Sequence, residues 1–95
     1  MRLRVLAILA VVFVARVAAA QVDVGRGLFQ TRCADCHGID AKGVHGPDLT
    51  VVFAKGATDD QVFQTIRRGV TGTEMPVSTA PDAEIRAVID YLHTI

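Results

Sequence analysis

Cys33-Ala34-Asp35-Cys36-His37 places two thiols and an imidazole within five consecutive residues of this 95-residue chain. Each thiol can add across one haem vinyl group to form a thioether, and the two-residue gap lets one turn of backbone reach both edges of the porphyrin. The neutral imidazole of His37 is then held beneath the iron as its proximal ligand. The motif therefore predicts one covalently bound haem c per chain, attached through Cys33 and Cys36.

Other uses of the same cysteines are less well supported by the sequence. A thiol-disulfide oxidoreductase places its C-x-x-C at the start of a helix that follows a strand, and no β-rich run precedes Cys33. A zinc site needs about four nitrogen or sulfur ligands, whereas the chain has two cysteines and three histidines without a second paired motif. A disulfide across two intervening residues would remove little chain entropy. Haem attachment is the leading prediction, and thiol redox chemistry is the main alternative.

The first twenty residues have the features of a secretory signal. Arg2 and Arg4 give a positive start, residues 5–14 are apolar without a break, and residues 18–20 are alanines. Arg16 interrupts the apolar run before it reaches the roughly 18 residues that span a bilayer. We predict a signal peptide over residues 1–20, one domain over residues 21–95 and a periplasmic location, with an uncleaved membrane anchor as the alternative.

Removal of the signal changes the composition of the chain. Seven basic residues then stand against ten acidic ones, a formal charge of −3. Arg67-Arg68 is the only basic pair, and no aromatic residues alternate with positive charge, so nucleic-acid binding is not expected. A core of 75 residues is marginal without a cofactor, and a buried haem would complete it.

The mature chain is predicted to be all-α, with about three helices. Asp23 is a plausible N-cap for a first helix that leads into Cys33. Glycines and a proline predict an extended loop over residues 38–57, and a capping box at Thr58 predicts a second helix over residues 59–68. After a loop over residues 70–80, a third helix carries an apolar stripe formed by Ile85, Val88, Ile89 and Leu92.

A six-coordinate iron needs a second axial ligand opposite His37. Met75 is the only methionine of the mature chain, and it lies in a polar loop rather than on an apolar helix face. Pro76 restricts Met75 to extended conformations, which helps to fix the direction of its side chain. Met75 is therefore the predicted distal ligand, with His45 as the rival, whereas His93 is expected to be exposed.

In these features the mature chain resembles the class I c-type cytochromes, and the resemblance implies a minimal cytochrome c fold of about three helices wrapped around the haem. It also implies that the Pro47 carbonyl accepts a hydrogen bond from the ring of His37. The first and last helices are expected to cross at Gly25, with Phe29 and Tyr91 at the contact. The matching segments are Gly25, Phe29, residues 33–37, residues 46–49, Met75-Pro76 and Tyr91-Leu92.

The function expected on this basis is that of an exported one-electron carrier between redox proteins such as a reductase, a dehydrogenase or an oxidase. Occupied axial positions leave no open site for substrate chemistry, so the protein is not expected to be an enzyme. We expect a monomer that contacts membrane complexes transiently through an exposed haem edge. A haem subunit docked to a larger dehydrogenase or oxidase is an alternative. For Arg67 and Arg68, pairing with haem propionates and a solvated helix end are both open.

Overall fold

The computed structural model describes residues 2–95, and all regular secondary structure among them is helical. Four helices follow one another along the chain, and a single turn, α2, accounts for the difference from the three expected. They are α1 (Arg2–Arg32), α2 (Ala34–His37), α3 (Asp59–Arg68) and α4 (Asp82–Leu92). The all-α prediction is confirmed.

Helix α1 is longer than the sequence pattern suggested. The prediction that a first helix begins at Asp23 is wrong, because α1 runs without a break from Arg2 to Arg32. Residues 17–22 contain three alanines and neither glycine nor proline, so no residue before Asp23 stops the helix. The Asp23 carboxylate instead pairs with Arg26 one turn later, at 2.7 Å. Cleavage after residue 20 remains a prediction.

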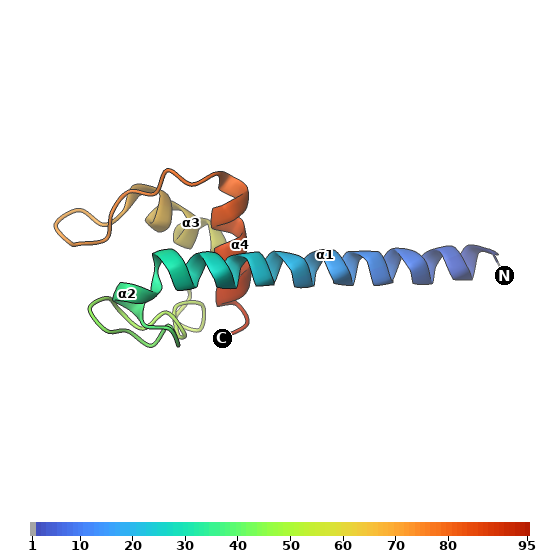
Figure 1. Ribbon diagram of the computed structural model, residues 1–95, viewed down its shortest axis with the longest axis horizontal. Helices are drawn as coiled ribbons and strands as arrows, with labels where there is room; N and C mark the ends of the chain where they lie inside the picture. The colour runs from blue at the N-terminus through green and yellow to red at the C-terminus, as the bar shows by residue number, and fades with distance from the viewer. Residues whose placement is uncertain (1) are drawn as a thin grey trace.

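The N-terminal half of α1 projects away from the rest of the molecule (Figure 1). Its apolar side chains are exposed, from Leu3 at 83% to Val17 at 53%. By length and composition α1 is the one helix within residues 2–95 that could cross a membrane, with a mean hydropathy of 2.4 in its most apolar window. The same features are found in a signal sequence near an N-terminus.

The C-terminal half of α1 crosses α4, and this crossing forms the main core. Gly25 lies so close to α4 that a Cβ atom there would be 1.9 Å from the carbonyl oxygen of Ala87. One turn further along α1, the Phe29 ring packs against Tyr91 with their centroids 5.5 Å apart. The helix crossing expected at Gly25 is therefore present, and the absence of a side chain at that position makes it sterically feasible.

Helix α3 has the predicted boundaries and packs on α4 through a second cluster made by Phe63, Ile85 and Ile89. The hydroxyl of Thr58 accepts a bond from the Gln61 amide, and the Gln61 side chain accepts one from the Thr58 amide. Both bonds of the expected capping box are therefore present.

Two long segments without regular structure complete the fold. They are the loop that follows α2 and the loop between α3 and α4, and each projects from the end of the molecule opposite the N-terminus (Figure 1). Helix α2 lies at the same end, directly after α1. The cysteine–histidine motif and the Met75 loop are thus carried to one end of a frame formed by α1 and α4.

Candidate functional site

The two cysteines lie within one turn of backbone, where α1 ends and α2 begins. Cys33 is the N-cap of α2; its amide donates to the Phe29 carbonyl, and its own carbonyl accepts from the amide of His37. Both thiols are free, Cys33 half-buried against the core and Cys36 exposed. This arrangement offers one sulfur from beside the core and one from the surface, within a single turn.

The environment of Cys33 does not favour thiolate chemistry. Burial raises the pKa of the Cys33 thiol, an effect that the positive charge of Arg32 only partly offsets. Nucleophilic cysteines of redox enzymes have the opposite property, a pKa lowered by positive charge or a helix terminus. This observation weighs against the thiol-disulfide oxidoreductase alternative.

Among residues 2–95, His37 is the one buried polar or charged residue, with 8% of its surface exposed. Its Nδ1 atom lies 2.9 Å from the Pro47 carbonyl oxygen, which is the contact that the resemblance implied. A carbonyl oxygen can only accept, so Nδ1 must carry the proton and donate it to Pro47. Nε2 is then left with a free lone pair, which is the form in which a histidine binds a metal.

The loop after α2 holds Pro47 in place by wrapping around the end of that helix. The amides of residues 44–46 all donate to the Cys36 carbonyl, at 2.7–3.1 Å, and the Gly43 amide donates to the His37 carbonyl at 2.6 Å. These bonds satisfy carbonyls that the end of a helix leaves without intrahelical partners. They also return the chain to the His37 ring just before Pro47.

Gly46 is a site residue to which the sequence pattern gave no role of its own. A Cβ atom at this position would lie 2.9 Å from Cε1 and 3.0 Å from Nδ1 of His37. The backbone at Gly46 therefore lies directly against the imidazole ring, and any side chain would tilt the ring. Its place immediately before Pro47 in the matching segment was the signal that could have identified it.

The turn that follows Pro47 is fixed by a carboxylate. Asp48 accepts hydrogen bonds from the Thr50 hydroxyl at 2.6 Å and from the Thr50 amide at 2.8 Å. These two bonds, the hydroxyl first, hold the pKa of Asp48 below its ordinary value. Asp48 thereby anchors the segment that carries the Pro47 carbonyl.

Met75 is half-buried in the loop between α3 and α4. Its carbonyl accepts a bond from the Val70 amide at 3.2 Å, and its amide donates to the Thr73 hydroxyl at the same distance. Gly69 has a positive φ of 66°, and a Cβ there would lie 2.7 Å from the Met75 carbonyl oxygen. The segment that carries Met75 therefore lies against the residues that directly follow α3.

The other candidate residues of the sequence are exposed or are bonded to other parts of the chain. His45 has an exposed side chain, and its amide belongs to the group that bonds Cys36. His93 stacks on Phe53 with centroids 3.8 Å apart and places Nε2 2.6 Å from Asp59. Arg68 is exposed at the end of α3, whereas the guanidinium of Arg67 bonds to the chain before α4.

These residues fit a haem c. Two free thiols lie within one turn, and the adjacent imidazole has Nε2 available because Nδ1 donates to a carbonyl. The loop between α3 and α4, whose sequence includes Met75, projects at the same end of the molecule as α2 (Figure 1). The two thiols suit covalent haem attachment, and the imidazole and the thioether suit axial ligation of the iron. The assignment of individual ligands remains a prediction.

Comparisons with known proteins find c-type cytochromes and subunits of cbb3-type oxidases. Residues 20–92 match a family model described as cytochrome C oxidase, cbb3-type, subunit III. A cytochrome c-553-like protein of Synechocystis is 36% identical over 73 residues, which cover 77% of this chain and 68% of that protein. The cbb3-type cytochrome c oxidase subunit CcoP of Helicobacter pylori is 32% identical over 76 residues, or 75% of this chain. The chain spans only about a quarter of the length of that subunit.

A solved structure shows the same fold. The crystal structure of cytochrome CL from Methylophaga aminisulfidivorans superposes with a TM-score of 0.70 and 29% identity, over 79% of this chain and 53% of that one. The family match covers the C-terminal part of α1 from residue 20, the cysteine–histidine motif, the Met75 loop and α4 together. The chain therefore belongs to the c-type cytochrome family that this model describes.

Proposed function

We propose that the protein is an exported monohaem cytochrome that carries single electrons between redox proteins. Cys33 and Cys36 form the thioether links, His37 is the proximal ligand and Met75 the distal one. When bound, the haem iron supplies a one-electron couple with a potential that the axial ligands and burial tune. The observation that carries the proposal is the His37 ring, buried and oriented by Pro47 so that Nε2 is free to bind iron.

Each group of the chain has a defined part in this function. The Pro47 carbonyl fixes the tautomer and the angle of the His37 ring and makes the imidazole a stronger donor. Gly46 contributes no Cβ atom, which would otherwise press on the His37 ring at 2.9–3.0 Å. If Met75 is the second ligand, side chains of this chain would hold the iron from both faces and leave no position for a substrate. We therefore assign the protein to the carriers rather than to the enzymes.

The apolar part of α1 serves export in this proposal. Residues 1–20 would direct the chain out of the cytoplasm, either as a cleaved signal or as a retained anchor, and the haem domain would lie in the periplasm. Its redox partners would bind weakly and transiently, as partners of small electron carriers do. A reductase, dehydrogenase or oxidase could supply or accept the electron.

A second candidate function is supported by the CcoP relatives. Those proteins are named as subunits of cbb3-type oxidases, and this chain matches about a quarter of each of the Helicobacter sequences. The chain would then be a haem-bearing module of a larger oxidase rather than a diffusing carrier. Purification from native membranes distinguishes the two, because a module elutes with its large partner in mild detergent and a carrier elutes alone.

A haem-stained denaturing gel tests the common part of both candidates. Protein made in a host that matures c-type cytochromes should keep its haem after denaturation, because thioether bonds survive unfolding. Cys36→Ala should yield little stained protein, whereas Asp35→Ala, between the cysteines and exposed, should stain like the parent. Unmodified thiols in correctly matured parent protein would refute the proposal, and mass spectrometry of the same sample would also give its N-terminus.

A further inference from the structure

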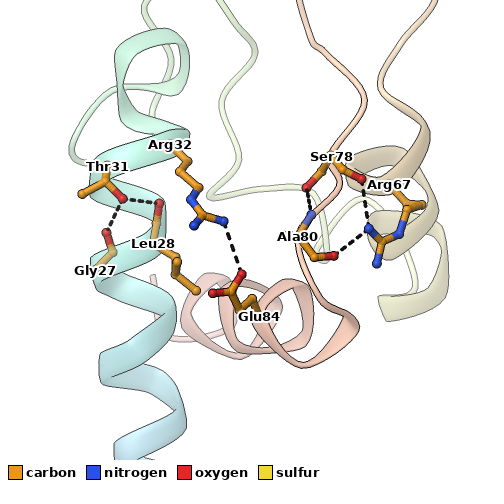
Figure 2. Close-up of polar contacts among 8 residues, drawn as sticks. All are labelled: Gly27, Leu28, Thr31, Arg32, Arg67, Ser78, Ala80 and Glu84. Atoms are coloured by element: carbon orange, nitrogen blue, oxygen red, sulfur yellow. Dashed lines mark hydrogen bonds and ion pairs between the residues drawn. The ribbon is translucent and has the colours of Figure 1, made fainter.

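Arg67 is the last residue but one of α3, and its side chain reaches across to the chain that leads into α4 (Figure 2). Its Nη1 atom donates to the carbonyl oxygens of Ser78 at 2.9 Å and Ala80 at 2.6 Å. Its Nη2 atom pairs with Asp82 at the start of α4. One side chain thus connects the end of α3 with both the returning segment of the loop and the next helix.

These contacts close the loop that carries Met75. The Ser78 amide donates in turn to the Arg67 carbonyl at 3.2 Å, so backbone and side chain of one residue hold the same segment. Nearer the tip, the Val70 amide donates to the Met75 carbonyl. Arg67 is also the less exposed partner of its ion pair, with 29% of its side chain accessible against 80% for Asp82. Its guanidinium is committed to the loop rather than to solvent.

We propose that Arg67 is a positioning residue for the distal ligand: by clamping the carbonyls of Ser78 and Ala80, it holds Met75 where its thioether can remain on the iron. The inference rests on the proposed function, in which Met75 is that ligand. A planar guanidinium can donate to two carbonyls and a carboxylate at once, which the single ammonium of a lysine cannot do with the same geometry. Hydrogen bonds from a charged donor are also stronger than neutral ones.

The consequence concerns how often the loop opens. A thioether competes with exogenous ligands for the iron, and a loop with only its backbone bonds would release Met75 more often. Removing one hydrogen bond from a charged donor shifts such an equilibrium by about tenfold or more. The bonds of Arg67 to Ser78 and Ala80 therefore set the affinity of the ferric protein for an added ligand.

Arg86 provides a matched control. Its guanidinium stacks on the Phe63 ring at 4.3 Å and pairs with Asp60, and that of Arg67 lies over the same ring at 5.6 Å. Both residues are arginines with an aromatic and an acidic partner, but the described contacts of Arg86 include none with the Met75 loop. The comparison of R67Q with R86Q therefore isolates the bonds to the loop.

The experiment titrates imidazole into the ferric holoproteins and follows the loss of the methionine-to-iron charge-transfer band. R67Q should bind imidazole about tenfold more tightly than the parent, R86Q should match the parent, and R67K should fall between the two. Amide hydrogen exchange of the same samples should be faster at Val70 and Ser78 in R67Q only. Should R67Q fail to mature, R67K carries the same comparison with R86Q.

The possible results separate the two proposals. A parent with the band, together with an R67Q that matches R86Q in imidazole affinity and exchange, would refute the role of Arg67 and leave the carrier function standing. A parent without the band would show that Met75 is not the ligand, which overturns both the distal assignment and the positioning role.

Discussion

Replacing Gly25 with alanine should force α1 and α4 apart. The added Cβ would lie 1.9 Å from the Ala87 carbonyl oxygen and 2.5 Å from its carbon, whereas real Cβ atoms essentially never come closer than 3.0 Å. These are backbone atoms, which cannot rotate aside as a side chain would. Relief therefore requires the two helices to separate by about 1 Å, and a densely packed core resists such a shift.

The size of the effect follows from two opposing contributions. Alanine improves the helix propensity of the position by about 1 kcal/mol relative to glycine. Overpacking costs about 1–3 kcal/mol, and the upper value applies here because the separation also loosens the Phe29–Tyr91 contact. We therefore expect Gly25→Ala to lower the free energy of unfolding by about 2 kcal/mol.

Gly27 offers a control two residues along the same helix. It is exposed, and a Cβ there would meet nothing within 4 Å. Gly27→Ala should raise the free energy of unfolding by about 1 kcal/mol, so the two variants should differ by about 3 kcal/mol. For a domain of this size that difference separates their melting temperatures by roughly 10–25 °C.

Circular dichroism of the two holoproteins during thermal and urea unfolding measures this difference. Equal stability of Gly25→Ala and Gly27→Ala would refute the reasoning, because it would mean that α1 does not pass so close to α4. A destabilised Gly25→Ala that retains haem and its reduced spectrum would place the loss in the helix crossing rather than in the haem site.

Three further outcomes are expected. Met75→Ala should keep its haem on a denaturing gel but lose the methionine-to-iron band and have a lower reduction potential. His45→Ala should keep the band and the potential of the parent. The converse result would make His45 the distal ligand. Gly46→Ala should shift the ferric electron paramagnetic resonance spectrum, because its Cβ would press on the His37 ring, and an unchanged spectrum would contradict this. Thr50→Val should raise the pKa of Asp48 in an NMR titration, since the hydroxyl bond that lowers it is lost. The lowered pKa stabilises the fold only above the ordinary carboxyl range, so this variant should be less stable than the parent at neutral pH and should equal it once pH falls below the folded-state pKa.

The helices were predictable where their signals are local. The capping box at Thr58 and the glycine at position 69 set the ends of α3, and both act through neighbouring residues alone. The start of α1 was not predictable in the same way, because Asp23 has the side chain of an N-cap but stands within an uninterrupted helix. An N-cap residue begins a helix only where the residues before it are not themselves helical. The alanines before Asp23 favour a helix, so the helix continues through Asp23.

Some residues of the candidate site were also predictable from the sequence, and others were not. The cysteines, His37 and Met75 were identifiable because each has a side chain whose chemistry is rare in the sequence. Gly46 and Arg67 were not assigned their roles, since a glycine has no chemistry of its own and an arginine at a helix end has many uses. Their parts depend on which backbone lies beside them, the His37 ring in one case and the carbonyls before α4 in the other.

The sequence by itself determined the candidate chemistry of this protein: two cysteines and a histidine at the spacing that suits a haem, a single methionine after residue 1, and the periodic stripe that makes α4 helical. Only the tertiary structure decided how those parts are held, because distances between residues far apart in the chain depend on packing. Three contacts show this: the close crossing of α1 and α4 at Gly25, the 2.9 Å bond from His37 to Pro47, and the bonds of Arg67 to the Met75 loop. Each joins segments whose relative position cannot be read from sequence spacing.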